Sequence, residues 1–261
     1  MKNASLPRLK RTWESIDLAT APCDGPVAFG DNLDAQTVLG AYRHGLYPFP
    51  ADTLEQRLLN EMSYEPDVAA GRVKLLDDSA EPYSVAWCSP DPRPLILVEQ
   101  ARVQRSLRRQ LRKATNWVTT ADACFERVIQ QCREGRAERW LTDELLASLC
   151  SLHKSGHAHS VEVWDDGQLI GGTLGVRIGA VFSADSQFTL RSGAGKVAVT
   201  DLTRRFAEAG GLAIDVQHDG DHARLLGARP IPRPQYLDML NAPHQGAPLP
   251  TEALPATRLA D

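Results

Sequence analysis

The chain has 261 residues, of which 43% are hydrophobic and 24% charged, and a formal net charge of −4. This is an ordinary globular composition. No apolar run reaches the length of about 18 residues that a membrane span needs, and the N-terminus lacks the apolar stretch of a signal peptide. The five cysteines include no C-x-x-C pair. We therefore expect no disulfide scaffold, no zinc ribbon and a cytoplasmic location.

The first part of the chain predicts a small domain over residues 1–94. Residues 1–30 are interrupted by Pro and Gly and are expected to be irregular. Residues 34–45 predict a short helix that begins at Asp34 or Asn32 and ends at Gly45. Residues 46–50 then predict an extended apolar turn. The polar residues 51–84 are interpreted as an insertion outside the core, with a possible helix at 53–62.

Positive charge is concentrated in the middle of the chain, after a predicted strand at 95–98. Residues 101–160 carry 11 Lys or Arg and 6 Asp or Glu, whereas residues 1–100 carry 9 and 15. Residues 101–113 predict a helix without a single acid, and its cations are Arg102, Arg105, Arg108, Arg109, Arg112 and Lys113. No neighbouring carboxylate compensates them. Either a solvated helix face or a nucleic-acid backbone would explain this pattern.

The remaining elements predict a layered α+β domain over residues 95–243. A strand near 117–120 precedes helices at 121–134 and 142–154, and strands follow at 159–164, 169–176 and 179–185. A helix at 196–209, a buried strand at 212–217 and a helical turn at 222–227 come next, and residues 244–261 are expected to form a disordered tail. This order suits an acyl-CoA N-acyltransferase-like fold behind a small N-terminal α/β domain.

Several motifs of known chemistry are absent or incomplete. The segment Arg191–Lys196 only partly matches a pyrophosphate-binding loop, and it fails the P-loop pattern because Val197 follows the lysine. Among the histidines near residue 155, only His157 and His159 share a strand face, and no carboxylate or Cys stands at ligand spacing. We therefore expect no metal site and no cofactor.

Asp215 and Gln217 form the most informative pair. In a strand, residues i and i+2 point to the same side, and the apolar residues Leu212–Ile214 indicate that this strand is buried. A buried carboxylate and amide are costly unless they bind each other or a ligand. The residues alone leave a structural and a catalytic interpretation open.

Several segments, taken in order, resemble the leucyl/phenylalanyl-tRNA–protein transferase family. They are Trp87–Arg93 (W-C-S-P-D-P-R), Trp140–Thr142 (W-L-T), Gly156–Trp164 (G-H-A-H-S-V-E-V-W), Gly171-Gly172, Phe182–Phe188 and Asp215-Val216-Gln217. The resemblance runs from about Phe29 to Leu240. It implies an aminoacyltransferase that moves Leu or Phe from aminoacyl-tRNA to the free α-amine of a protein beginning with Arg or Lys, which marks that protein for degradation by the N-degron route. Separately, we expect the protein to be a monomer.

The resemblance also implies roles for individual residues. The carbonyl oxygen of Gln217 would orient the attacking amine and draw its proton, Asp215 would hold and polarise Gln217, and Asp185 would meet the basic end of the acceptor. The residues implied for the aminoacyl pocket are Thr173, Phe182, Ser186, Gln187, Val199, Leu202 and Ile214. Phe49, Trp140 and the cations of residues 101–113 are implied to bind the tRNA.

Some positions depart from the family pattern. Thr173 and Gln187 stand where the family commonly has Met, Phe49 replaces a Trp, Leu149 a Tyr and Asp185 a Glu. Each polar group in an apolar pocket would disfavour Leu by about 1–3 kcal/mol if unsatisfied. A different amino acid, or a small-molecule amine as acceptor, is therefore an alternative. An acyl-CoA N-acyltransferase and an RNA-binding protein without activity are two others.

Overall fold

The chain divides into two compact units in a computed structural model. Unit 1 comprises residues 1–92 and 136–151, and unit 2 comprises residues 93–135 and 152–261. The structure describes residues 13–76, 80–113, 116–134, 140–244 and 246–260 of the chain. Helix α6 (Asp143–Lys154) begins in unit 1 and ends in unit 2. The sequence pattern had placed the whole of 95–243 in the second domain, whereas residues 136–151 group with unit 1.

Unit 1 contains a sheet with the strand order β2-β4-β1-β3. Its strands are β1 (Pro26–Gly30), β2 (Tyr47–Pro50), β3 (Lys74–Leu75) and β4 (Val85–Cys88), and β4 lies antiparallel to both β1 and β2. Helix α2 (Ala35–Arg43) begins where Asp34 accepts the backbone N–H of Thr37, and Gly45 takes a positive φ just after it ends. These helix limits agree with the sequence prediction.

Two expectations about unit 1 were wrong. Residues 26–30 form the buried strand β1 rather than an irregular segment, and Pro26 is tolerated because it is the first residue of the strand. Residues 51–84 are not wholly outside the core, because Val73 and Tyr83 pack against Phe29. Helix α3 (Leu54–Ala69) has no buried residue, and its capping box at Thr53 and Gln56 stabilises its first turn.

Unit 2 is built on one large mixed sheet. Among the described residues its strand order is β11-β5-β10-β9-β8-β7-β6-β12. The central strands are β5 (Arg93–Leu97), β6 (Trp117–Ala121), β7 (Ala158–Asp165), β8 (Gln168–Ile178), β9 (Val181–Thr189) and β10 (Ala213–Asp215). Strands β6 to β9 form an antiparallel meander, whereas β10 runs parallel to β9 and antiparallel to β5.

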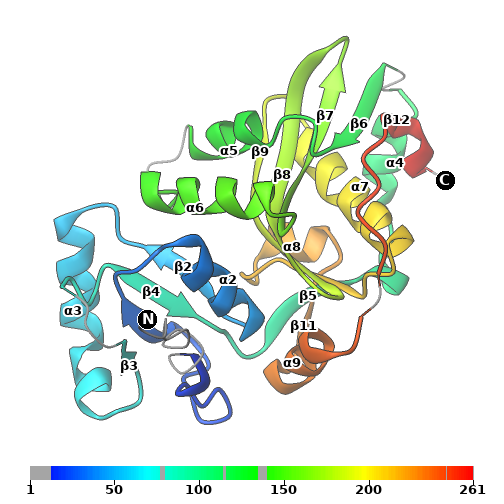
Figure 1. Cartoon of the computed structure of the whole chain (residues 1–261). Helices are drawn as coiled ribbons and strands as arrows, with labels where there is room; N and C mark the ends of the chain where they lie inside the picture. Colours follow the sequence, from blue (N-terminus) through cyan, green and yellow to red (C-terminus); the bar gives the residue numbers. More distant parts are fainter. Residues whose placement is uncertain (1–12, 77–79, 114–115, 135–139, 245, 261) are drawn as a thin grey trace, which may run out of the picture. The chain divides into compact units, whose positions relative to one another are not determined.

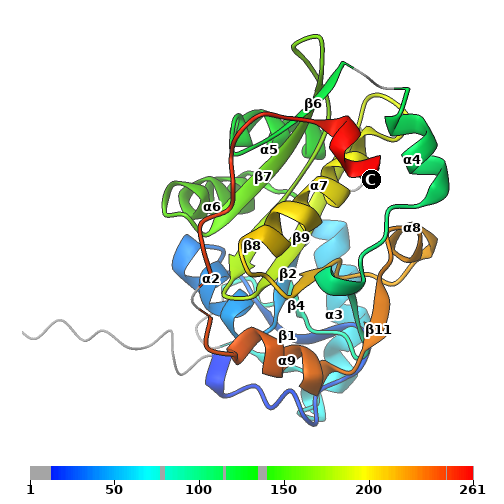
Figure 2. The ribbon, with the colours of Figure 1, turned by 90° about the vertical axis from the view of Figure 1, so that its right-hand side faces the viewer.

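Helices cover both faces of this sheet (Figure 1; Figure 2). A Cβ at Gly171 would collide with Ala194 and Gly195 of α7 (Ala194–Glu208), while one at the next residue, Gly172, would approach Val128 of α5 (Phe125–Arg133). Successive strand residues face opposite sides. Helix α7 therefore packs on one face, and α5 packs on the other.

The C-terminal segment is ordered, contrary to the expected disordered tail. Strand β12 (Leu254–Pro255) pairs with β6, and the short helix η2 (Ala256–Ala260) buries Leu259 and Ala260. The buried guanidinium of Arg205 on α7 donates to the carbonyl oxygens of Pro250 and Glu252 at 2.8 and 2.9 Å. These contacts with the unit 2 core hold a Pro-rich sequence that lacks regular periodicity.

The remaining elements of unit 2 lie at both ends of its sheet. They are η1 (Val98–Gln100), α4 (Arg105–Leu111), α8 (Asp221–Leu225), β11 (Arg229–Ile231) and α9 (Arg233–Asn241). Helix α4 lies against η2, and β11 lies at the β5 edge. The predicted basic helix is shorter than expected, because Arg102 precedes its first turn. None of the described helices has the length and hydropathy needed to cross a bilayer. The described residues also contain no group of three or more His, Cys, Asp or Glu side chains that could bind a metal.

Candidate functional site

The candidate site lies where two parallel strands of unit 2 separate. Strand β10 pairs with β9 only from Ala213–Val181 to Asp215–Ser183, and β9 then continues to Thr189. Beyond Asp215 the chain turns sharply, and Gln217 adopts a φ of 63°. This left-handed conformation is uncommon for a residue with a side chain, and such strain concentrates at functional sites.

A buried ion pair fixes the end of β10. The Nε and Nη2 atoms of Arg93 both donate to Oδ2 of Asp215, at 3.0 and 2.7 Å, and both side chains are completely buried. Oδ1 of Asp215 accepts the backbone N–H of Gln217 at 2.9 Å. The Asp215 carboxylate therefore holds the left-handed turn and compensates a buried guanidinium.

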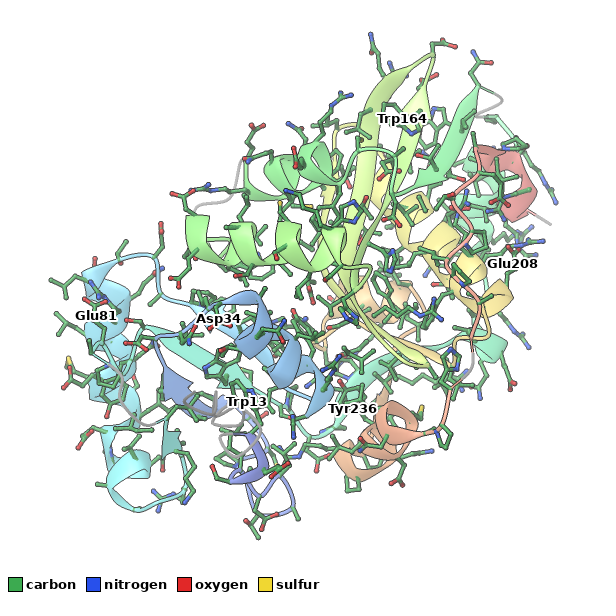
Figure 3. The ribbon with its side chains drawn as sticks, in the orientation of Figure 1. Trp13, Asp34, Glu81, Trp164, Glu208 and Tyr236 are labelled. Atoms are coloured by element: carbon green, nitrogen blue, oxygen red, sulfur yellow. The ribbon has the colours of Figure 1, made fainter. Side chains whose placement is uncertain are left out.

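Tyr236 of α9, which Figure 3 labels, packs against the guanidinium of this ion pair. The Arg93 guanidinium lies 4.6 Å from the centre of its ring, and the Tyr236 hydroxyl is hydrogen-bonded to Asp215. Burial raises the pKa of the Tyr236 hydroxyl far above its usual value, and the nearby carboxylates add to this effect. The hydroxyl therefore stays protonated and donates to Asp215.

The side chain of Gln217 crosses the gap to β9. Its Nε2 donates to Oγ of Ser183 at 2.9 Å and to Oδ1 of Asp185 at 2.6 Å. The register of β9 against β8 shifts at Asp185, which has no partner residue on β8, and this irregularity lets Asp185 reach the same amide as Ser183. Both amide hydrogens are thus used, and the carboxylate of Asp185 can only accept, which fixes the orientation of the amide. The Oε1 atom of Gln217 is held as an acceptor.

These contacts correct one part of the sequence interpretation. Asp215 and Gln217 do lie together, but strand β10 ends at Asp215, so they do not share a strand face. Asp215 binds the backbone of Gln217, whereas Ser183 and Asp185 hold its side-chain amide. The prediction that Asp215 polarises that amide is therefore wrong, because both amide hydrogens point toward β9.

Six of the seven residues considered for an aminoacyl pocket lie between the sheet and α7, whereas Ser186 pairs with Leu174 on the other face of the sheet. Phe182, Val199, Leu202 and Ile214 are buried in one apolar cluster. Thr173 on β8 stands directly opposite Gln187 on β9, and Oε1 of Gln187 lies 3.6 Å from where a Cβ of Gly195 would be. The Thr173 hydroxyl donates to the carbonyl oxygen of Ser186 at 2.9 Å. Its hydrogen-bonding requirement is therefore met within the sheet.

The residues considered for tRNA binding fall in both units. Phe49 of unit 1 is 40% exposed, and Trp140, also of unit 1, is half-buried. In unit 2 Arg105, Arg109, Arg112 and Lys113 are exposed on or beside α4. Arg102, which is also exposed, and Arg108, which is half-buried, line a cavity beside α7.

The predicted site residues did not include Arg93, Ser183 or Tyr236. A signal for Arg93 was present, since a lone cation that opens the apolar run of residues 94–98 requires a buried partner. No comparable pattern marks Ser183 or Tyr236, because their roles depend on strand register and on the position of α9.

Comparisons with known proteins agree with the resemblance. Residues 95–241 match the family model described as leucyl/phenylalanyl-tRNA protein transferase. A leucyl/phenylalanyl-tRNA–protein transferase of Chromohalobacter salexigens is 35% identical over 98% of this chain and 89% of its own. One of Photobacterium profundum is 32% identical over 90% and 87%, and one of Xanthomonas oryzae is 34% identical over 82% and 75%.

Similarity to solved structures is weaker. A conserved protein of unknown function from Bacteroides thetaiotaomicron is 15% identical with a TM-score of 0.37, over 62% of this chain and 58% of that one. These values are too low to compare the folds in detail.

Proposed function

The chain belongs to the leucyl/phenylalanyl-tRNA–protein transferase family, and we propose that it moves Leu or Phe from aminoacyl-tRNA to the free α-amine of an acceptor protein that begins with Arg or Lys. The observation that carries this proposal is the 35% identity over 98% of the chain. The acceptor product carries one additional N-terminal residue, and in the N-degron route this residue directs the protein to degradation.

The reaction needs little chemical activation, because an aminoacyl ester is already reactive. The amine nitrogen attacks the ester carbonyl, the new N–C bond forms and the C–O bond to the ribose breaks. The amine loses one proton, and the departing ribose oxygen gains one. Oε1 of Gln217 accepts the N–H of the amine and orients it, and the enzyme supplies proximity rather than a strong base. The Asp185 carboxylate accepts an N–H of the same amide. This hydrogen bond polarises the amide and makes Oε1 a stronger acceptor.

Asp215 has a positioning role in this proposal. Its carboxylate is occupied by Arg93, by the Gln217 backbone and by the Tyr236 hydroxyl. It therefore keeps the left-handed turn in place instead of taking the proton of the amine. Asp185 is also the residue that we assign to the cationic side chain of the acceptor, since a carboxylate pairs well with Arg or Lys.

The aminoacyl side chain would occupy the space between the sheet and α7. Phe182, Ile214 and Leu202 supply apolar surface there, and Val199, Thr173 and Gln187 complete this side. Ser186, which pairs with Leu174 on the other face of the sheet, contributes its backbone carbonyl oxygen to Thr173. Burial of a Leu or Phe side chain on such a surface is worth about 1.5–3 kcal/mol. Because the Thr173 hydroxyl donates to Ser186, its penalty against an apolar substrate is smaller than the sequence suggested.

The tRNA would bind through cations and aromatic rings. Arg105, Arg109, Arg112 and Lys113 are exposed and suited to phosphate oxygens, and Phe49 and Trp140 offer surfaces for unpaired bases. Arg102 and Arg108 add to the positive potential of this segment. No metal or cofactor is needed for this chemistry.

We also assign unit 2 to the acyl-CoA N-acyltransferase-like fold, with RNA in place of CoA. The strand pair β9–β10, joined through α7 and parallel only at its start, is the feature that supports this assignment. The loop before α7 argues against CoA itself. Gln110 donates to the carbonyl oxygen of Ser192, and its amide lies where a Cβ of Gly193 would be. A pyrophosphate would have to displace this side chain.

A transfer assay with purified protein tests the function. A panel of charged tRNAs is incubated with two peptides that differ only in an N-terminal Arg or Ala, and the peptide mass is measured. We expect Leu or Phe to be added to the Arg peptide alone. The proposal fails if no peptide gains an amino acid while the protein still binds tRNA, which is the result expected of an inactive RNA-binding protein.

A second candidate function differs in the substrates. The polar pair Thr173–Gln187 faces α7 beside the apolar cluster, and a site with hydrogen-bonding groups discriminates strongly for polar substrates. If the Thr173–Gln187 pair binds a polar group of the substrate, the enzyme would transfer another amino acid or use a small-molecule amine as acceptor. The same panel, supplied with small amines, separates the two candidates.

A further inference from the structure

A cavity of about 290 Å³ in unit 2 lies outside the proposed reaction site. It opens between the segment from η1 to α4 and the side of α7 that faces away from the sheet. Part of its wall is aliphatic and is formed by Val98, Val103, Leu226 and Leu259. The cavity does not contact Asp215 or Gln217. Of the residues considered for the aminoacyl pocket, only Val199 borders it.

Three arginines and no acidic residue line this cavity. Arg102, Arg108 and Arg204 supply the positive charge. Arg204 is partly compensated, because its Nε lies 3.7 Å from Glu208 at the end of α7 (Figure 3). The Nε–H of Arg108 is buried and meets no acceptor within the described part of the chain. A buried donor without an acceptor is costly and is satisfied when a ligand supplies one.

The shape and charge of the cavity restrict what it can bind. An inorganic anion would leave the aliphatic walls empty, and an uncharged apolar molecule would leave Arg108 without an acceptor. No aromatic ring lines the cavity, so a nucleobase would lack the stacking surface that RNA-binding pockets provide. The volume is close to the lower end of small-ligand pockets, which is about 300 Å³.

We propose that this cavity binds a small amphipathic anion, whose carboxylate or phosphate head pairs with Arg102 and Arg108 and whose aliphatic body lies against Val98, Val103 and Leu259. Guanidinium groups bind both kinds of head through charge-assisted hydrogen bonds. The exposed cations of α4 remain free for another partner when this ligand is bound.

The test measures the binding of octanoate and octyl phosphate to the purified full-length chain by calorimetry. We expect at least one of them to bind, and which head binds more tightly identifies the natural class. Octanol, which lacks the head, and acetate and inorganic phosphate, which lack the body, should bind more weakly by roughly tenfold or more. Failure of both octyl compounds to bind overturns the proposal, and so does equal binding of inorganic phosphate.

Matched variants locate the binding. Arg108→Leu removes a cavity cation, whereas Arg109→Leu removes its exposed neighbour and serves as the control. Ala207→Phe fills the cavity from α7 without a change of charge. We expect octanoate affinity to fall about tenfold or more in Arg108→Leu and Ala207→Phe, to stay unchanged in Arg109→Leu and to recover partly in Arg108→Lys. Unfolding midpoints without ligand verify that each variant is folded. Equal losses of octanoate affinity in Arg108→Leu and Arg109→Leu would indicate nonspecific charge attraction and contradict a cavity site. A loss of RNA binding in Arg108→Leu with unchanged octanoate affinity would contradict it as well.

Discussion

Arg93 donates two hydrogen bonds to a single oxygen of Asp215, through Nε at 3.0 Å and Nη2 at 2.7 Å, and neither side chain is exposed. This contact joins β5 to the end of β10 and leaves the other Asp215 oxygen for the backbone of Gln217. The sharp turn at the candidate site therefore depends on a buried charge pair rather than on a glycine.

The first prediction concerns this pair. Arg93→Leu leaves a buried carboxylate without its cation, and loss of one partner of a buried pair costs about 3–5 kcal/mol of unfolding free energy. Urea denaturation measures the loss. The double variant Arg93→Leu/Asp215→Leu is the control, and it should recover a large part of the stability because no buried charge remains. A single variant as stable as the wild type would contradict the structural role assigned to the pair.

The second prediction concerns Gln217. Gln217→Ala removes the fixed Oε1 acceptor, and we expect kcat for aminoacyl transfer to fall by roughly 100-fold or more, with little change in KM for tRNA. Asp185→Asn should lower kcat less, because the amide keeps its bond to Ser183. Gln168→Ala, at the exposed β7–β8 turn, is the matched control. Unchanged kcat in Gln217→Ala would exclude the proposed role.

Much of this site could be predicted from the sequence. Asp215 and Gln217 were identified because two polar residues follow an apolar strand, and the limits of helix α2 followed from Asp34 and Gly45. The side-chain contacts of Asp215 and Gln217 could not be predicted. They depend on the register of β10 against β9 and on the left-handed turn at Gln217, for which the sequence has no Gly, Asn or Asp signal.

The ordered C-terminal segment was missed for a related reason. Its sequence has no helical or strand period, and its order comes from contacts with residues distant in sequence, such as the bonds from Arg205 and the pairing of Leu254 with Thr119. Strand β1 was missed because Pro and Gly flank a short apolar run. In a local sequence pattern Pro and Gly indicate turns. In the structure Pro26 and Gly30 are the first and last residues of the buried strand β1.

The third prediction concerns the exposed cations of α4. Arg109→Gln and Arg112→Gln each remove one charge available to a phosphate, so the slope of log affinity for tRNA against log salt concentration should fall by about 0.7–0.9 per contact. Filter binding across a salt series measures this slope. Arg224→Gln, whose guanidinium is already paired with Asp219, is the control and should leave the slope unchanged. Equal slopes in all variants would contradict RNA binding at α4.

The fourth prediction concerns the C-terminal segment. Deletion of residues 247–261 removes Leu249 and Leu259 from the core and takes two acceptors from the buried guanidinium of Arg205. We expect the unfolding free energy to fall by about 3 kcal/mol or more, because apolar burial and a charged donor's hydrogen bonds are lost together. Thermal and urea denaturation measure this. Thr251→Ala, an exposed position in the same segment, should change stability by less than about 0.5 kcal/mol.

The last prediction concerns the buried carboxyl of Glu162 on β7. Burial raises its pKa above the ordinary value of 4.5, even though Ser160, Thr120 and the backbone of Ala123 donate to it. The folded state therefore binds this proton more tightly than the unfolded state. Its contribution to stability is fully present below the unfolded pKa and is lost as pH rises through the folded pKa.

Glu162→Gln cannot lose that proton, so the variant should gain stability relative to the wild type as pH rises above about 4.5, with the difference reaching a plateau above the raised pKa. Urea denaturation at a series of pH values measures the difference. Glu126→Gln on the exposed side of α5 is the matched control, and it should leave the pH dependence of stability as in the wild type. A difference that shrinks with rising pH would show that the three donors outweigh the cost of burial, and the carboxylate would then be the form that stabilises this sheet.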